Sequence, residues 1–588
     1  MSSNYDDALT RAASQVCARM GGYADELTRH SPVPGGVIVV TGRTRQLAQV
    51  AFGHADVERG QPMSPDRLFQ IGSISKVFTS LLAGQLAAES VLCLDDPVTE
   101  YLPWLELGDG ARRPATLRAL LSHTAGLVIG SDALPDDLAQ VWSLRNLAVS
   151  AGPARFHYSN LGFQILGLAL SARVGEPLPD LVRRRLLHPM GMADSIPAVT
   201  HADRPRLAVG YAAARQDQPW VPGDPLAPAA WFEIAASDGN IAATGTDLAR
   251  LAMLLLGRGQ VAGRPVVDEA VVEEMTTSLA PEGKPEMTLP GVLPATSSRY
   301  GLGVNVETIA GNQCLTHGGG MVGYSTFLLA DTVAQVGVVV LTNADGDNLH
   351  AQLLARLTHA ELLGRLSGSG AAELPPVDPL VRVPGAPVGA AADAGTDPLP
   401  LGRFTAVSTM ADPEQAPATI EVSREPGGAI TVTGRQRTGR LFRTLTGRYV
   451  TDHPDLRRYP LDPSGTEGGH GWSHGPVAYL SESVLPASDG GEAEVPALWR
   501  ALAGHYRCYS PWYPEFRIFV RDGALWLAAA GGVEAPGQDE QLVQVGPGVF
   551  RIGGEDWLPE RLVAGPVVSG RVVSVDRDGC VYSRTFTP

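Results

Sequence analysis

The stretch "FQIGSISKVFTSLLAGQLA", Phe69 to Ala87, places a lysine three residues after a serine. Lysine is rare in this chain: of 46 basic residues, only Lys76 and Lys284 are lysine. The spacing of apolar residues predicts a helix, on which Ser73 and Lys76 share one face. Arginine stays protonated in proteins, whereas a desolvated lysine can accept a proton. The pattern therefore predicts a serine nucleophile with Lys76 as its base.

The residues around this pair support the same interpretation. Gly72 leaves Ser73 in the first turn of the helix, where unpaired N–H groups and the positive end of the dipole favour an alkoxide. Ser75 is the competing serine, but Phe78 stands three residues after it. We therefore expect Ser75 to have no catalytic role.

A second motif lies in "FHYSNLGFQILG", which contains Tyr158, Ser159 and Asn160. A tyrosine beside an ammonium group can relay a proton. In an extended loop, Asn160 would point the same way as Tyr158 because side chains alternate along extended backbone. Taken alone, the motif also fits a core tyrosine with a hydrogen-bonded hydroxyl.

A third motif is His317 followed by Gly318, Gly319 and Gly320, ahead of the apolar run "YSTFLLA". Glycines let a backbone lie flush against a ligand, and a strand edge can then donate an N–H to a developing oxyanion. The alternative for this motif is a glycine-rich turn with a solvated histidine.

Composition bounds the function. The 588 residues predict two to four domains. A formal charge of −16 without a long basic run argues against nucleic acid or an anionic membrane surface as partner. The first residues lack a secretory signal pattern, and no apolar stretch reaches the roughly 18 residues of a membrane span. We therefore expect a cytoplasmic protein.

Neither a disulfide framework nor a metal site is indicated. The five scattered cysteines predict reduced packing residues: Cys17, Cys93, Cys314, Cys508 and Cys580. His123 and His188 have no His or carboxylate at metal-ligand spacing. We expect no metal and no cofactor.

The pattern changes along the chain. Residues 1–365 alternate helix-like and strand-like segments and predict an α/β domain, including a helix with Thr246 as N-cap. Residues 366–400 are rich in Pro, Gly and Ala and predict a linker. Two segments that repeat weakly, 401–490 and 491–588, contain hairpin patterns and predict two β-barrel-like units. One larger β domain is the alternative.

The order and spacing of the three motifs resemble the serine β-lactamase and penicillin-recognising family, and most closely its class C-like branch, the S12 peptidases. Further similar segments are "LDDPVTEYLP", "LRALLSHTAGL", "HPMGMADS" and "SDGNIAATGTDLARL". The resemblance covers about residues 30–365. It implies an antiparallel sheet flanked by helices, together with an all-helical subdomain.

The resemblance also implies acyl transfer. Ser73 would attack a carbonyl, and Lys76 and Tyr158 would share the general base and acid roles. The backbone N–H groups of Ser73 and Gly320 would form the oxyanion hole. Asn160 would orient Lys76 and a substrate amide, and the segment from His317 through Gly319 would help to bind the substrate.

The chain departs from the family pattern at His317, where β-lactamases and carboxypeptidases usually have Lys-Thr-Gly. A histidine is mostly neutral near pH 7, so recognition of a substrate carboxylate is in doubt. His-x-Gly resembles D-aminopeptidases and related enzymes, which carry lipocalin-like β-barrel domains after the catalytic domain. The class A motif Ser-Asp-Asn and its separate glutamate are not found.

Three functions remain open at this point. The first is a serine hydrolase of small peptides or amides, with D-residues as a candidate specificity. The second is an esterase or acyltransferase, including thioesterases of the penicillin-binding-protein type that cyclise peptides. The third is a peptide-binding protein without turnover. The expected partner is a small peptide, amide or ester substrate, and a homo-oligomer is an open alternative.

Overall fold

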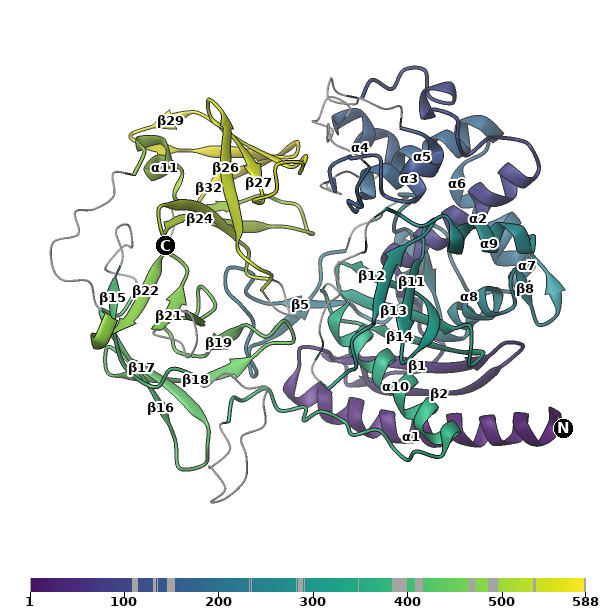
Figure 1. The fold of residues 1–588 in the computed structure, drawn as a ribbon, viewed down its shortest axis with the longest axis horizontal. Coiled ribbons are helices and arrows are strands. Elements are labelled where there is room, and N and C mark those ends of the chain that lie inside the picture. The colour runs from purple at the N-terminus through teal and green to yellow at the C-terminus, as the bar shows by residue number, and fades with distance from the viewer. Residues whose placement is uncertain are drawn as a thin grey trace.

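We describe a computed structural model of the chain. It covers residues 2–107, 115–130, 134, 136–144, 154–231, 233, 235–281, 283, 289, 291–346, 348–382, 399–407, 416–464, 471–484, 495–531 and 536–585. An α/β region is followed by an all-β region that lies beside it (Figure 1). Lys284 and residues 383–398 of the expected linker fall outside the described residues.

The α/β region is built on one antiparallel eight-stranded sheet in the order β10-β11-β12-β13-β14-β1-β2-β3. Its strands are β1 (Gly35–Gly42), β2 (Gln46–Asp56), β3 (Gln61–Pro62), β10 (Ser297–Tyr300), β11 (Asn305–Ile309), β12 (Asn312–Met321), β13 (Tyr324–Asp331) and β14 (Val336–Thr342). The first strand, β1, pairs with β14 near the end of the region, Ile38 opposite Val340. The two β-branched runs, near opposite ends of the α/β region, thus form neighbouring strands in the middle of one sheet.

Helices cover both faces of this sheet because β1 and β14 are buried on both sides. Val37 and Val39 face one core with α2 and α8, whereas Ile38 and Val40 face the other with α1 and α10. The helices and single turns of the region are α1 (Ser2–His30), η1 (Gly72–Ile74), α2 (Ser75–Ala88), η2 (Val98–Glu100), α3 (Leu117–Leu121), α4 (Asp137–Leu144), α5 (Asn160–Val174), α6 (Leu178–Val182), η3 (Arg183–Leu187), α7 (His188–Met190), η4 (His201–Arg206), α8 (Gly245–Leu256), α9 (Glu269–Thr277) and α10 (Leu349–Ser367).

A helical subdomain that includes α3, α4, α5 and α6 lies above the sheet (Figure 1). Three short strand pairs lie outside this sheet: β4 (Phe69–Gln70) with β7 (Ala242–Ala243), β5 (Tyr211–Ala213) with β6 (Leu226–Pro228), and β8 (Gln260–Val261) with β9 (Arg264–Pro265). The expected α/β architecture with an antiparallel sheet and a helical subdomain is confirmed.

The all-β region contains two separate strand systems. The first is a sheet in the order β19-β18-β17-β16-β15-β22-β21-β20, and the second is a closed barrel of β23 to β28 with β31 and β32. Each has its own hydrophobic core, around Trp472 in the sheet and around Phe516 in the barrel. Two separate cores fit the prediction of two β units better than the alternative of one larger β domain. The boundary we propose between them falls outside the described residues.

The strands of the first system are β15 (Gly402–Val407), β16 (Thr419–Arg424), β17 (Ile430–Gly434), β18 (Arg437–Arg443), β19 (Tyr449–Thr451), β20 (Asp462–Ser464), β21 (Gly471–His474) and β22 (Val477–Ser481), followed by η5 (Glu482–Val484) and α11 (Ala497–Leu502). Those of the second are β23 (Gly504–Arg507), β24 (Glu515–Arg521), β25 (Ala524–Ala528), β26 (Glu540–Gly546), β27 (Val549–Ile552), β28 (Arg561–Ala564), β31 (Ser574–Arg577) and β32 (Cys580–Arg584), with a side hairpin of β29 (Val567–Val568) and β30 (Arg571–Val572). Both predicted hairpins, β16–β17 and β24–β25, are present.

Three local predictions need correction. Thr246 lies inside α8, whose N-cap is Thr244, because the Thr244 side chain accepts the N–H of Asp247 at 3.1 Å. Cys93 is exposed, so it is not a packing residue, although all five cysteines are free thiols. Helix α10 continues to Ser367, past the expected start of the linker at residue 366. Across the described part of the chain, we find no helix whose length and hydrophobicity match a membrane-spanning segment.

Close backbone contact fixes the η1 turn against strand β12. Gly72 has φ +53°, a conformation that favours glycine, and a Cβ there would overlap the backbone of Gly320. A Cβ on Gly319 would overlap the Ile71 carbonyl and the Thr326 hydroxyl. The glycines on both segments therefore set the position of the turn that carries Ser73.

Gly319→Ala should lower the free energy of unfolding by roughly 1–3 kcal/mol, because a methyl group must enter a filled backbone contact. Chemical denaturation measures this change. Gly22→Ala in α1 is the matched control, since a Cβ there meets nothing within 4 Å and alanine favours a helix. Equal stability of the wild type and Gly319→Ala would contradict the packing account.

Candidate active site

Ser73 and Lys76 meet at the junction between the η1 turn and helix α2. The Lys76 Nζ atom lies 3.1 Å from the Ser73 Oγ atom, which is hydrogen-bond distance. Lys76 is fully buried, whereas Ser73 is half-buried and lines a cavity. Ser75 is buried and its hydroxyl accepts the N–H of Ile241 at 3.1 Å. Ser75 is thus occupied in packing, as expected.

Asp238 is a partner of Lys76 that the sequence reasoning did not assign. Lys76 Nζ donates to the Asp238 carbonyl at 3.0 Å and lies 3.5 Å from its Oδ2 atom. Gln164 donates to the other carboxylate oxygen at 3.2 Å. Burial favours the neutral amine of lysine and the carboxylate favours the ammonium form, so the two effects oppose each other. The sequence signal for Asp238 was its segment, "SDGNIAATG", which resembles the family but had no catalytic role assigned to it.

Aromatic rings surround the Lys76 amine on its other side. Lys76 Nζ lies 5.1 Å from the centre of the Tyr158 ring and 5.6 Å from that of Phe163. The Tyr158 ring in turn packs against His123, with ring centres 4.3 Å apart. His123 Nδ1 accepts the N–H of Ser159 at 3.1 Å, so His123 holds both the ring and the backbone of this motif.

The Tyr158–Asn160 motif is not a wholly extended loop, because α5 begins at Asn160. Ser159 is extended, with φ −142°, and its hydroxyl caps the helix by accepting the N–H of Gly162 at 2.9 Å. That hydroxyl donates to the Val128 carbonyl at 2.7 Å. Tyr158 and Asn160 nevertheless both line the cavity, as the sequence predicts.

His317 lines the same cavity, and both of its ring nitrogens face protein groups. Nδ1 lies 2.7 Å from the Gly318 carbonyl, which only accepts hydrogen bonds, so this nitrogen carries a proton. Nε2 lies 3.0 Å from the Tyr300 hydroxyl. Burial, with a smaller effect of Tyr158, raises the pKa of Tyr300 well above its ordinary value, so the phenol stays protonated and can donate. The contacts therefore place a proton on Nδ1 and set Nε2 against the Tyr300 phenol.

The glycines after His317 divide between two roles. Gly318 and Gly320 line the cavity, and Gly320 also contacts the turn that carries Ser73. Gly319 was expected to bind substrate, but it is not among the lining residues and packs against the Ile71 carbonyl instead. On β12, Gly319 therefore packs against the segment before Ser73 and does not face the cavity.

The cavity has a volume of about 480 Å³ and two walls. The α/β region supplies the residues described above, and the barrel supplies residues 511–515 and 529–531. Trp512 also packs against the core of the α/β region. The sequence left open whether the β region shapes this site, and the structure places barrel residues in its wall.

The barrel also contacts the side chain of His157, the residue before Tyr158. Glu560, buried at the end of the loop before β28, lies 2.6 Å from His157 Nε2 and accepts the N–H of Ile129 at 3.1 Å. The Ile129 carbonyl accepts the N–H of Asn160 at 2.9 Å. A single carboxylate thus joins the barrel to His157 directly and to Asn160 through Ile129.

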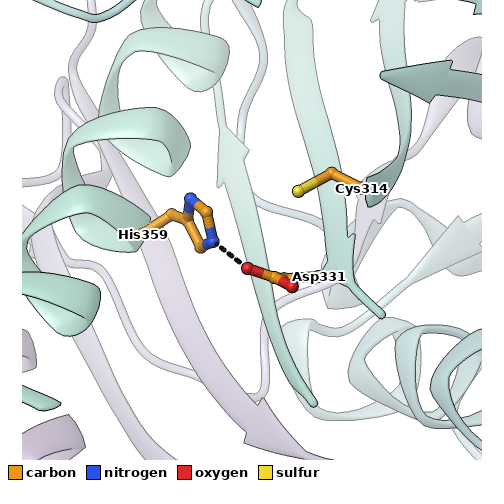
Figure 2. Close-up of side chains that lie close together, drawn as sticks. All are labelled: Cys314, Asp331 and His359. Atoms are coloured by element: carbon orange, nitrogen blue, oxygen red, sulfur yellow. Dashed lines mark hydrogen bonds and ion pairs between the residues drawn. The ribbon is translucent and has the colours of Figure 1, made fainter. Parts of the chain in front are cut away.

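Cys314, Asp331 and His359 form a buried cluster between the sheet and helix α10 (Figure 2). Their potential ligand atoms lie within 4.8 Å of one another, a spacing that could hold a metal ion. Both Asp331 oxygens, however, are already filled by His359 Nε2 at 2.8 Å, an asparagine amide at 2.7 Å and two backbone N–H groups at 2.9 and 2.7 Å. Burial raises the pKa of Cys314, so it is not a thiolate. We interpret the cluster as a tie between α10 and the sheet.

The chain is similar in sequence to known proteins. A family model described as Beta-lactamase matches residues 22–362, more than half of the chain. Esterase EstB from Burkholderia gladioli is 31% identical over 226 residues, which cover 35% of this chain and 57% of that protein. Penicillin-binding protein 4 from Amycolatopsis lactamdurans is 28% identical over 245 residues, 40% of this chain and 62% of that protein. The chain thus spans less than two thirds of the length of either of these relatives.

A solved structure also resembles nearly the whole chain. The octameric penicillin-binding protein homologue from Pyrococcus abyssi superposes with a TM-score of 0.54 and 20% identity. The match covers 92% of this chain and 99% of that chain. At this identity the likeness concerns the fold, and it extends through the all-β region.

Glu560→Gln should lower kcat about tenfold while KM changes little, because the Tyr158 segment loses a charged contact but the cavity wall remains. Steady-state kinetics of the full chain measure kcat and KM separately. Glu555→Gln is the matched control, an exposed glutamate in the same barrel. A fall confined to KM, or no change at all, would count against a positioning role for Glu560.

Asp331→Asn should lower the free energy of unfolding at pH 7 by about 3 kcal/mol, because a buried pair loses its charge. Burial alone would raise the pKa of Asp331, but hydrogen bonds from His359 and Ala334 outweigh it and hold the pKa below its ordinary value. The stabilisation is therefore present above the ordinary aspartate pKa and is lost as the pH falls through the lower folded value.

Denaturation at pH 7 and pH 3 measures this dependence, with the exposed Asp522→Asn as control. Asp331→Asn should lose less stability than the wild type on acidification. A parallel pH dependence of the two proteins would show that Asp331 is not the linked group.

Proposed function

Because the chain belongs to the β-lactamase family, we propose that it is a serine hydrolase that acts on small peptides or amides through an acyl-enzyme. The observation that carries this proposal is the fully buried Lys76 amine, 3.1 Å from the hydroxyl of Ser73 at the cavity wall. A class C-like, S12-type enzyme is the branch that the Tyr158–Asn160 motif favours.

In the proposed first step, the neutral Lys76 amine takes the Ser73 proton while Oγ bonds to the substrate carbonyl carbon. The backbone N–H groups of Ser73 and Gly320 stabilise the oxyanion. As the C–N bond breaks, the leaving nitrogen receives a proton from the Tyr158 and Lys76 pair. Water then attacks the acyl carbon and gives a proton to the Tyr158 and Lys76 pair. The bond from the acyl carbon to Oγ breaks, Ser73 takes that proton, and the acid product leaves.

His317 bears on the substrate class. In enzymes that hold a substrate carboxylate, the residue at this position of the third motif is usually a lysine. A histidine is mostly neutral near pH 7, so this position offers such a group less positive charge than a lysine does. We therefore favour amides and peptides without a carboxylate at that position over penicillins, and D-aminoacyl amides are the first candidates.

An esterase or acyltransferase is the second candidate function. The similarity to Esterase EstB favours it, and the same Ser73, Lys76 and Tyr158 would serve ester cleavage. Transfer of the acyl group to an amine, as in a peptide-cyclising thioesterase, differs only in the nucleophile of the second step. Cytoplasmic location and a homo-oligomer, as in the octameric homologue from Pyrococcus abyssi, stay predictions for this chain.

Lys76→Arg should abolish labelling by a fluorophosphonate probe and lower kcat/KM by about a thousandfold, because arginine keeps the charge but cannot accept the serine proton. Ser73→Ala should abolish labelling as well. Lys284→Arg is the matched control, the same change at the only other lysine, and should leave labelling intact. If Lys76→Arg is labelled at the wild-type rate, Lys76 is not the base. If the wild type itself is not labelled, a binding protein without turnover is favoured.

A substrate panel separates the candidate activities. The panel contains D- and L-aminoacyl p-nitroanilides, p-nitrophenyl esters and nitrocefin. We expect the D-aminoacyl anilide and the ester to be turned over fastest and nitrocefin slowest. Ester cleavage without anilide cleavage, or product transfer to an added amine, would favour the second candidate instead.

A further inference from the structure

Two cysteines lie side by side where the barrel closes. Cys508 directly follows strand β23, and Cys580 is the first residue of β32, the strand that closes the barrel against β23. The two strands are antiparallel, with Arg507 opposite Ser583, so the chain beyond Arg507 runs alongside the start of β32. The two thiols are hydrogen-bonded to each other. Both side chains are half-buried and pack against the barrel core, so small molecules can still reach them.

Cys508 also holds the loop that forms the barrel's part of the cavity wall. Its backbone N–H donates to the Pro514 carbonyl at 2.9 Å, and its Sγ atom lies 3.5 Å from the Tyr513 carbonyl. The Ser510 N–H donates to the same sulfur at 3.3 Å. Residues 511–515 of this loop line the catalytic cavity. A change at the Cys508 sulfur therefore acts on the wall through contacts within one short loop.

The surroundings of the two sulfur atoms give them different reactivity. The hydrogen bond from Cys580 has the largest effect on Cys508, and the Ser510 N–H adds to it. Together with Tyr582 and the positive charge of Arg577, they outweigh burial and hold the pKa of Cys508 below its ordinary value. The same thiol–thiol hydrogen bond, with burial, raises the pKa of Cys580, which keeps its proton. A thiolate is the attacking group in thiol–disulfide exchange, and a neighbouring thiol completes it.

We propose that Cys508 and Cys580 form a reversible disulfide, with a low-molecular-weight disulfide as the oxidant, and that this bond changes the barrel's wall of the catalytic cavity. Where a compartment keeps most thiols reduced, such pairs act as redox sensors and not as permanent cross-links. This inference concerns a modification site outside the proposed catalytic residues, and formation of the bond does not depend on the proposed reaction.

The exchange takes two steps. The Cys508 thiolate attacks one sulfur of the small disulfide RSSR, so that a mixed disulfide forms and the thiolate RS⁻ leaves. That thiolate takes the proton of Cys580, whose sulfur then attacks the Cys508 sulfur and releases a second RS⁻. The two protein sulfurs lose two electrons, and the small disulfide is reduced to one thiol and one thiolate.

The bond moves the loop because it is short. A disulfide bond is about 2.05 Å long, which is shorter than any hydrogen bond between two thiols. Cys508 must therefore approach β32, and Pro514, whose carbonyl its backbone N–H holds, is drawn with it. Displacement of a cavity wall by a fraction of an ångström is enough to alter the position of a bound substrate.

Intact-mass spectrometry and peptide mapping of the full chain test the bond itself and need no activity. Incubation with glutathione disulfide should remove the mass of two hydrogen atoms and join the peptides that contain Cys508 and Cys580, and dithiothreitol should reverse both changes. Cys580→Ser should stop at a mixed disulfide on Cys508, because the second thiol is missing. Cys93→Ser, which removes an exposed thiol elsewhere, is the matched control and should form the bond as the wild type does.

Two further measurements test the effect on the cavity. Oxidation should lower kcat/KM for a p-nitrophenyl ester roughly tenfold in the wild type and leave Cys508→Ser and Cys580→Ser at the activity of the reduced protein. The difference in tryptophan fluorescence between the wild type and Trp512→Phe reports the wall without turnover and should change on oxidation. If no bond forms, or the bond joins other cysteines, the site is overturned. A bond that leaves both kcat/KM and the Trp512 signal unchanged overturns its link to the cavity.

Discussion

The burial of the Lys76 amine is the constraint on which the site depends. An amine removed from water must be held by hydrogen bonds or lose its charge. Here the Asp238 carbonyl and carboxylate hold it on one side, the Tyr158 ring covers another, and the Ser73 hydroxyl lies at 3.1 Å. Each of these neighbours comes from a different segment, so the fold must bring several loops to one point.

Close backbone packing fixes the positions of these segments relative to one another. The turn that carries Ser73 lies against strand β12 so closely that Cβ atoms on Gly72 or Gly319 would overlap the facing segment. The sheet in turn is held from both sides by helices packed on β1 and β14. The position of the nucleophile thus follows from core packing and not from contacts within the site.

The sequence predicted the residues whose signals are local. The three-residue spacing correctly predicted that Ser73 and Lys76 lie close together, although Ser73 belongs to the η1 turn and only Lys76 to α2. The β-branched runs of β1 and β14 were recognisable as strands. Glu515 and Glu560 could not be assigned, because each reaches the site only through tertiary contacts. Asp238 lies in a segment that resembles the family, but no role was assigned to it. The Thr246 prediction failed for a smaller reason: Thr244, two residues earlier, also precedes the apolar run, and its hydroxyl makes the cap.

The barrel is the part of the molecule that distinguishes this site from an isolated catalytic domain, since it adds a cavity wall and a carboxylate beside His157. The central claim is nonetheless covalent chemistry at Ser73. Intact-mass spectrometry after rapid acid quench of the protein with a slowly hydrolysed ester tests it most directly. We predict an acyl adduct that peptide mapping places on Ser73. Turnover of the ester with no adduct, or with an adduct on another residue, would contradict the account.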